Sequence, residues 1–153
     1  MSGEWQVRID GAARGNPGPA GVGVVLVDPE GNVVDEVARG IGWATNNVAE
    51  YRALIEGLKL ARSHGADRLR VFSDSSLMVQ QMRGAYKVRH EGLKPLHAEA
   101  SRLAKGFAGI RFEAVPRERN RRADELANLG VDRDNPEARA PGHGSGTGTD
   151  RLF

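Results

Sequence analysis

The chain has 153 residues, 39% of them hydrophobic and 27% charged, which suits one globular domain and is too short for two comfortable ones. It has no cysteine, which excludes disulfides and thiolate metal sites. No apolar run approaches the length of a membrane span and the N-terminus lacks the features of a signal peptide, so we expect a cytoplasmic protein without a membrane partner. The formal net charge is only +2, which by itself says little about partners.

Three strands are predicted at the start of the chain. Trp5, Val7 and Ile9 alternate with polar residues, which indicates a strand with one buried face. Residues 11–19 are rich in glycine and proline and are typical of a turn region. Further strands are expected over residues 21–27 and 33–41, and the short connections between the three strands predict an antiparallel meander.

The rest of the chain alternates between helical and strand patterns. Apolar residues at helical spacing predict a helix from about residue 47 to residue 64, with Asn46 as its N-cap. The elements expected after it are a strand at 69–72, helices at 75–82 and 91–105, a strand at 110–115 and a helix at 120–131. This order, βββαβααβα, predicts an α/β domain over residues 1–133 with parallel pairing in its second half. Residues 134–153 are rich in Gly, Ser, Thr and Pro and are expected to form a flexible tail.

Basic residues are concentrated in one stretch. Between Arg83 and Arg122 there are eleven basic and four acidic residues, a net charge of +7. A positive surface of this kind suits a polyanionic ligand. A solvated helix face is the alternative, and charge alone favours it.

Four carboxylates, Asp10, Glu50, Asp74 and Asp124, fall on four separate predicted elements. Asp10 and Asp74 follow strands, where ligand sites form in open α/β sheets, and Glu50 and Asp124 border apolar helix stripes. Each has an ordinary explanation as a turn residue, a cap or an exposed helix charge. Brought together, they would repel one another and lose hydration unless a cation lay among them. Since hard divalent ions take oxygen ligands and can stabilise the reacting oxygens of a phosphodiester, the set predicts a metal-dependent nuclease.

The residues around these carboxylates form distinctive phrases. The chain reads Asp-Gly-Ala-Ala-Arg-Gly-Asn-Pro-Gly-Pro-Ala-Gly over 10–21, Thr-Asn-Asn-Val-Ala-Glu over 45–50 and Ala-Asp-Glu-Leu-Ala-Asn over 123–128. With these phrases and this order of elements, residues 4–132 resemble the type 1 ribonuclease H family, endonucleases that cut the RNA of RNA–DNA hybrids. The resemblance implies a ribonuclease H-like fold, a five-stranded mixed sheet with helices on both faces. It also implies hydrolysis to 3′-hydroxyl and 5′-phosphate ends by a monomer.

The resemblance further implies a role for particular residues. Asp10, Glu50, Asp74 and Asp124 would hold two Mg²⁺ ions, with Mn²⁺ as a substitute and Asp10 as the bridging ligand. Asparagines would read the 2′-hydroxyls that distinguish RNA from DNA, and Thr45 would help to hold a phosphate of the DNA strand. Loop and cap residues are the alternative for the asparagines. The substrate-binding residues implied in this way are Gly11, Asn16, Thr45, Asn46, Asn47, Tyr86 and Lys87.

The sequence departs from the family pattern in several places. Trp43 stands where many relatives have a basic residue near the DNA phosphate, and Ser76 replaces a common glutamine. Where many relatives carry a mobile histidine, the loop before the last helix holds Arg117, as in the archaeal-like branch. Arg117 stays protonated and cannot act as a base, so it would bind a phosphate or the transition state, unless it is a plain surface arginine. A basic protrusion is lacking, which leaves Tyr86 and Lys87 to contact the DNA strand; for Lys87 a solvated charge is the alternative.

Two other functions compete with this interpretation. A hybrid-binding module without catalysis is disfavoured by the four intact carboxylates, and a resolvase or transposase-type nuclease by the asparagines.

The terminal Leu152 and Phe153 resemble the short peptides by which bacterial DNA-handling proteins bind the sliding clamp. They predict a weak contact of that kind, although the usual upstream glutamine is absent, and chance or a folded-back tail is the alternative.

Overall fold

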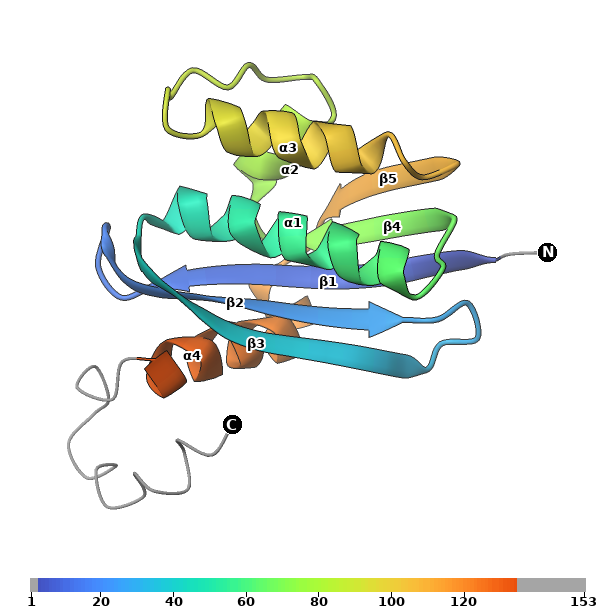
Figure 1. Ribbon diagram of the computed structural model, residues 1–153, viewed down its shortest axis with the longest axis horizontal. Helices are drawn as coiled ribbons and strands as arrows, with labels where there is room; N and C mark the ends of the chain where they lie inside the picture. Colours follow the sequence, from blue (N-terminus) through green and yellow to red (C-terminus); the bar gives the residue numbers. More distant parts are fainter. Residues whose placement is uncertain (1–2, 135–153) are drawn as a thin grey trace.

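The computed structural model describes residues 3–134, and Figure 1 shows a sheet with α1 on one face and α4 on the other. Asp134, expected to begin the tail, is the last residue of a helix, and the rest of the expected tail, with Leu152 and Phe153, lies outside the described residues. The strands are β1 (Glu4–Ala13), β2 (Gly18–Val27), β3 (Val33–Ala44), β4 (Arg68–Ser73) and β5 (Gly109–Ala114). The helices are α1 (Asn46–Ser63), α2 (Ser76–Met82), α3 (Lys94–Ala104) and α4 (Arg121–Asp134), with a 3-10 helix, η1 (Arg117–Arg119), before α4.

The sheet has five strands in the order β3-β2-β1-β4-β5. β1 and β3 pair antiparallel with β2, because short turns connect these strands, whereas β4 pairs parallel with both β1 and β5 after helical crossovers. The predicted order of elements and the mixed sheet are therefore confirmed. None of the helices within residues 3–134 is long and apolar enough to cross a bilayer.

The structure differs from the sequence-based expectation at several element boundaries. Residues 11–13 belong to β1 and not to a turn, because Gly11 pairs with Val22 in the ladder with β2. The N-cap of α1 is Thr45 and not Asn46: the Thr45 hydroxyl accepts a hydrogen bond from the amide of Val48 at 3.2 Å. α3 begins at Lys94, later than expected, since Pro95 fits only the first turn of a helix.

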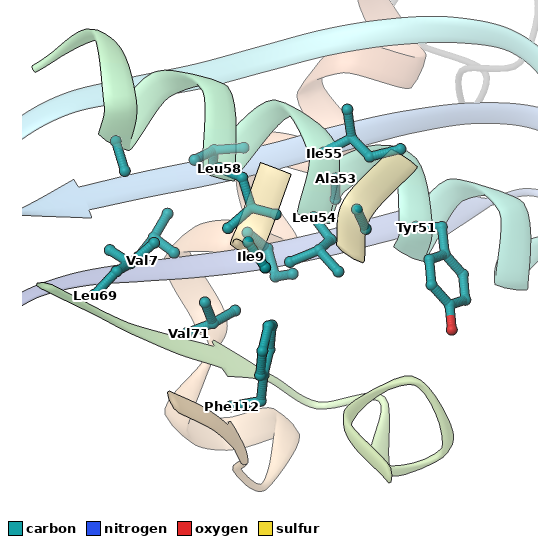
Figure 2. Close-up of a cluster of buried hydrophobic side chains, with 14 of the residues drawn as sticks. Val7, Ile9, Tyr51, Ala53, Leu54, Ile55, Leu58, Leu69, Val71 and Phe112 are labelled. Carbon is teal, nitrogen blue, oxygen red and sulfur yellow. The ribbon is translucent and has the colours of Figure 1, made fainter. Parts of the chain in front are cut away.

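The core between α1 and the sheet fixes the position of the helix. Figure 2 shows Leu54 and Leu58 of α1 packed over Val7 and Ile9 of β1, and all four are fully buried. Burial of each such side chain contributes about 1.5–3 kcal/mol. The periodic leucines of α1 thus hold the middle of the helix over β1.

On the opposite face, α4 packs against β1, β2 and β3. A Cβ at Gly23 of β2 would lie 2.1 Å from the carbonyl oxygen of Ala123, so only glycine permits this approach of backbones. Since Gly23 pairs with Asp10 in the sheet, this contact brings the start of α4 close to Asp10.

Candidate active site

Three carboxylates from different elements meet where the parallel pairing of β1 with β4 ends. Arg8 lies opposite Phe72 in that pair, and two residues further along the chain come Asp10, which is still in β1, and Asp74, which lies just after β4. Glu50 reaches the same place from the first turns of α1. One carboxylate oxygen from each of Asp10, Glu50 and Asp74 lies within 4.8 Å of the others.

The backbone of Gly11 positions Glu50. Its amide donates a hydrogen bond to Glu50 Oε1 at 3.1 Å. A Cβ at this position would lie 2.2 Å from the carbonyl carbon of Ala49, so the missing side chain lets α1 rest directly on β1. The structure therefore places Gly11, implied above as a substrate contact, in a buried position beneath Glu50.

Burial and mutual repulsion raise the pKa values of the clustered carboxyls. Asp10 is only 2% exposed, and burial, with the nearby charges of Glu50, Asp74 and Asp124, raises its pKa to about 9. Burial and the charge of Asp74 raise the pKa of Glu50 to about 8, and burial also raises that of Asp74. Asp10 Oδ2 is buried without a hydrogen-bond partner among the described residues. A buried acceptor with no donor, facing two further carboxylates, fits a divalent cation.

Asp124 joins this group from α4, although its oxygens are not among those within 4.8 Å of one another. Its charge nevertheless contributes to the raised pKa of Asp10. Asn128, one helical turn later, donates from Nδ2 to Asp124 Oδ1 at 3.3 Å and orients the carboxylate.

Arg117 lies beside the cluster in η1. Its Nε is 3.9 Å from Asp74 Oδ2, with the Arg117 side chain 79% exposed and that of Asp74 13%. Water screens such a pair, so it contributes little to stability and leaves the guanidinium accessible to a ligand. A cavity of about 440 Å³ next to it is lined by Arg117, Glu118, Arg121, Asp124 and Glu125.

Two of the three asparagines predicted to read RNA are joined by a hydrogen bond, and one of these two also bonds to β1. Asn16 Oδ1 accepts from the backbone amide of Asn46 at 3.0 Å, and Asn46 Oδ1 accepts from the amide of Ala13 at 3.1 Å. Asn16, Asn46 and Asn47 are exposed. Within residues 3–134 the Nδ2 groups of Asn16 and Asn46 donate no hydrogen bond, so they are available to an acceptor on a ligand.

The remaining residues implied in substrate binding cap α1 or lie in the connection between α2 and α3. Thr45 caps α1 through its hydroxyl. Tyr86 and Lys87 are exposed in the connection between α2 and α3. Trp43, near the end of β3, is 71% exposed.

The chain was compared with known proteins. The family model described as "Reverse transcriptase-like" matches residues 8–130. The bifunctional protein Rv2228c of Mycobacterium tuberculosis is 50% identical over 127 residues, and ribonuclease HI of Halobacterium salinarum is 45% identical over 124 residues. These matches cover 82% and 81% of this chain but only 35% and 62% of the relatives, so the chain spans less than two thirds of their lengths.

Solved structures give a fuller match. The crystal structure of RNase H1 from Halobacterium salinarum superposes with a TM-score of 0.83 at 44% identity, covering 85% of this chain and 98% of that one. The chain belongs to the type 1 ribonuclease H family. LC11-RNase H1, solved in complex with an RNA/DNA hybrid, is 43% identical with a TM-score of 0.80, and the match covers 85% of this chain and 98% of that one. This family of hydrolases accounts for both the fold and the phrases around Asp10, Glu50 and Asp124.

Sequence reasoning missed the residues that support the ribonuclease H carboxylates. The hydrogen bond from Gly11 to Glu50 joins residues far apart in the chain, and no local pattern indicates it. Asn128 stands in the phrase that carries Asp124, at the i+4 spacing that permits a contact on a helix, and this spacing could have identified it. The sequence predicts Asn120 only as the first residue of the last helix, whereas in the structure it lies just before α4 and is buried.

The raised pKa values predict that the metal-free protein loses stability as pH rises. A carboxyl whose folded pKa is about 9 and whose ordinary value is 3.8 favours the folded state while protonated, and this contribution is lost as pH rises toward 9. We expect the melting temperature in EDTA to fall by about 5 °C or more between pH 5.5 and 9. Thermal unfolding followed by fluorescence measures it.

Asp10→Asn is the matched control for this pH dependence. It should flatten the decline, since the group with the largest shift is gone, and a divalent ion should flatten the decline for the wild type. A wild-type melting temperature in EDTA that does not change over this range contradicts the raised pKa values.

Proposed function

We propose that the chain is an endonuclease that hydrolyses the RNA strand of RNA–DNA hybrids with the help of divalent metal ions. The observation that carries this proposal is the buried Oδ2 of Asp10, which has no hydrogen-bond partner within residues 3–134 and belongs to a cluster of three carboxylates. The cluster lies in a chain of the type 1 ribonuclease H family. One member of this family, LC11-RNase H1, has been solved in complex with an RNA/DNA hybrid.

Asp10, Glu50 and Asp74, with Asp124, would hold the ions. We propose two Mg²⁺ ions, with Mn²⁺ able to replace them, since carboxylate oxygens suit both metals. When bound, such ions supply positive charge that lowers the pKa of water and stabilises a leaving 3′-oxygen, which gives 3′-hydroxyl and 5′-phosphate ends.

The chain's own residues would orient the hybrid at this centre. The Nδ2 groups of Asn16 and Asn46, with Asn47 beside them, would donate to the 2′-hydroxyls of the RNA strand, which selects RNA over DNA. Arg117, accessible beside Asp74, would contact a phosphate close to the carboxylates. Thr45, Tyr86 and Lys87 remain proposed contacts to the DNA strand.

Cleavage of matched substrates tests the proposal. Labelled RNA–DNA hybrid, double-stranded RNA and duplex DNA of one sequence are incubated with Mg²⁺ or Mn²⁺, and the ends of the products are determined. We expect cleavage of the RNA strand of the hybrid. Binding of the hybrid without cleavage would favour the non-catalytic module, and cleavage of duplex DNA a nuclease of the resolvase or transposase kind.

Arg117→Ala should separate a catalytic contact from a surface arginine. If the guanidinium stabilises charge that develops in the transition state, kcat should fall about 10- to 100-fold with KM nearly unchanged. Steady-state kinetics on the hybrid measures both. The fold should be unaffected, because the side chain is exposed.

The matched control for Arg117→Ala is Arg119→Ala, which removes another exposed arginine from the same 3-10 helix. It should leave kcat and KM unchanged. An effect of Arg117→Ala on KM alone would make Arg117 a binding residue, and no effect would make it a surface charge.

Monomeric state, cytoplasmic location and the tail remain predictions. The sliding-clamp contact of Leu152 and Phe153 can be tested by titrating a labelled peptide of the last residues into a bacterial clamp. Equal, negligible binding by this peptide and by its doubly alanine-substituted version would end that hypothesis.

A further inference from the structure

Two asparagines flank Asp124 on α4. Asn120 lies immediately before the helix, and Asn128 lies one turn after Asp124. At about 100° per residue, positions four apart differ by only about 40° around a helix, so Asn120, Asp124 and Asn128 lie on one side of it. The carboxylate thus has an amide side chain one turn before it and another one turn after it.

Asn120 connects this helix to the strand that carries Asp10. Its side chain is 1% exposed, and Nδ2 donates to the carbonyl oxygen of Ile9 at 2.8 Å. Ile9 immediately precedes Asp10 in β1. The carbonyl oxygen of Asn120 accepts from the amide of Asp124 at 3.1 Å, and its amide donates to the carbonyl of Arg117 at 2.9 Å. One residue therefore joins the backbone beside Asp10, the turn of Asp124 and the 3-10 helix of Arg117.

Helix capping alone does not explain Asn120. Its Oδ1 is buried without a partner among the described residues, and burial of an unmatched acceptor is unfavourable. A cap normally uses its side-chain oxygen to accept from the first turn of the helix. Here the side-chain Nδ2 of Asn120 instead donates a hydrogen bond to the carbonyl of Ile9 in β1. This bond indicates that the side chain serves to connect α4 to the strand.

Asn128 makes the second connection. Its Nδ2 donates to Asp124 Oδ1, and its own Oδ1 accepts from Arg14 Nη2 at 3.3 Å. Arg14 follows the last residue of β1 and also pairs with Asp132, one turn further along α4. The Asp124 carboxylate is thus tied through Asn128 to the segment that follows β1.

We propose that Asn120 and Asn128 are positioning residues that form an asparagine clamp, in which Asn120 holds α4 against β1 and Asn128 holds it against the segment that follows β1, on the two sides of Asp124. The clamp sets the Asp124 carboxylate relative to Asp10, so that the fourth carboxylate joins the other three in holding divalent ions. This role rests on the proposed metal-dependent function. It assigns neither asparagine a contact with substrate.

Metal binding measured without nucleic acid tests the clamp directly. Titration calorimetry with Mn²⁺ is performed on wild type, Asn120→Ala and Asn128→Ala, alongside melting temperature, kcat and KM. We expect each variant to bind Mn²⁺ about 10-fold more weakly and to lose kcat by a similar factor, with KM for the hybrid within about twofold. Wild-type Mn²⁺ affinity in both variants would overturn the clamp, whatever their melting temperatures.

Gln81→Ala is the matched control for destabilisation. Gln81 is a buried amide whose Oε1 accepts from Tyr51 Oη at 2.6 Å. Its loss should lower the melting temperature as Asn120→Ala does, but leave Mn²⁺ affinity unchanged. If Gln81→Ala weakens Mn²⁺ binding as much as the clamp variants do, the effect is general loosening and the clamp is rejected.

A double-mutant cycle with Asp124→Asn asks whether the clamp acts through Asp124. In that background, Asn120→Ala and Asn128→Ala should weaken Mn²⁺ binding no further. Additional loss equal to that in the wild type would show that the asparagines do not act through this carboxylate. If Asn120→Ala does not fold, Mn²⁺ affinity is compared in Asn120→Ser and in Asn128→Ala, whose side chain is only half-buried in the wild type.

Failure of the clamp is distinguishable from failure of the proposed function. Asp10→Asn should lose Mn²⁺ binding if the carboxylates hold metal at all. Loss in Asp10→Asn with full affinity in the asparagine variants rejects the clamp alone. Full affinity in Asp10→Asn rejects the metal centre, and the clamp with it.

Discussion

Asp10→Asn is expected to abolish cleavage of RNA–DNA hybrids and to make the metal-free protein more stable. Asp10 is buried among three other acidic groups, and its pKa of about 9 shows that ionisation in this place is unfavourable without a cation. A neutral amide of the same shape removes that repulsion. We expect a gain in unfolding free energy on the order of 1–3 kcal/mol in EDTA at pH 8.

The same substitution should remove the stabilisation that divalent ions give to the wild type. Activity is measured on a labelled hybrid, hybrid affinity by fluorescence anisotropy, and stability by thermal unfolding with and without Mg²⁺. Affinity for the hybrid should stay nearly unchanged, since Asp10 is buried. A variant that keeps most of the wild-type rate would refute the assignment of Asp10 to the metal centre.

Gly11→Ala should damage both the fold and the site, although it adds a single methyl group. The new carbon would lie 2.2 Å from the Ala49 carbonyl carbon and 2.4 Å from the amide nitrogen of Glu50, so α1 must move away from β1. That movement also breaks the 3.1 Å hydrogen bond that holds Glu50. We expect a loss of at least about 3 kcal/mol in unfolding free energy and very little cleavage.

Gly109→Ala is the matched control for this glycine. Apart from the adjacent residues of the chain, the nearest atom to a Cβ there would be 3.7 Å away, and it belongs to the flexible Arg68 guanidinium. Denaturant unfolding and the rate of hybrid cleavage should both stay near wild type in this control. Wild-type stability in Gly11→Ala would show that α1 can shift without cost, contrary to the packing described above.

The sequence predicts the order of elements and the mixed sheet because its patterns are local. Alternating residues such as Val7 and Ile9, and helical spacing such as that of Leu54 and Leu58, each arise within one element. Ends of elements are less well predicted, because partners far along the chain decide them. Residues 11–13 extend β1 because β2 lies beside them. Thr45 is the N-cap of α1, while the side-chain Oδ1 of Asn46 accepts a hydrogen bond from the amide of Ala13 in β1.

In the site, too, local sequence patterns indicate some residues, and contacts between remote segments decide the others. Asp10, Glu50 and Asp124 stand in distinctive phrases and Asp74 follows a predicted strand. The oxygens of Asp10, Glu50 and Asp74 lie close together, and Asp124 is near enough to raise the pKa of Asp10. What supports them is a set of contacts between remote segments. The donation from Asn120 to Ile9 spans 111 positions, and no pattern within a single segment indicates such a bond.

The distribution of the carboxylates over β1, α1, the end of β4 and α4 bears on how the protein survives in a cell. No single segment carries the set, so unfolded or partly assembled molecules do not present it. Ions that bind only the native chain shift the population toward that chain in proportion to their concentration and affinity. Depletion of divalent ions would therefore do more than stop turnover: it would raise the fraction of chains open to proteases, so that ion supply governs abundance as well as rate.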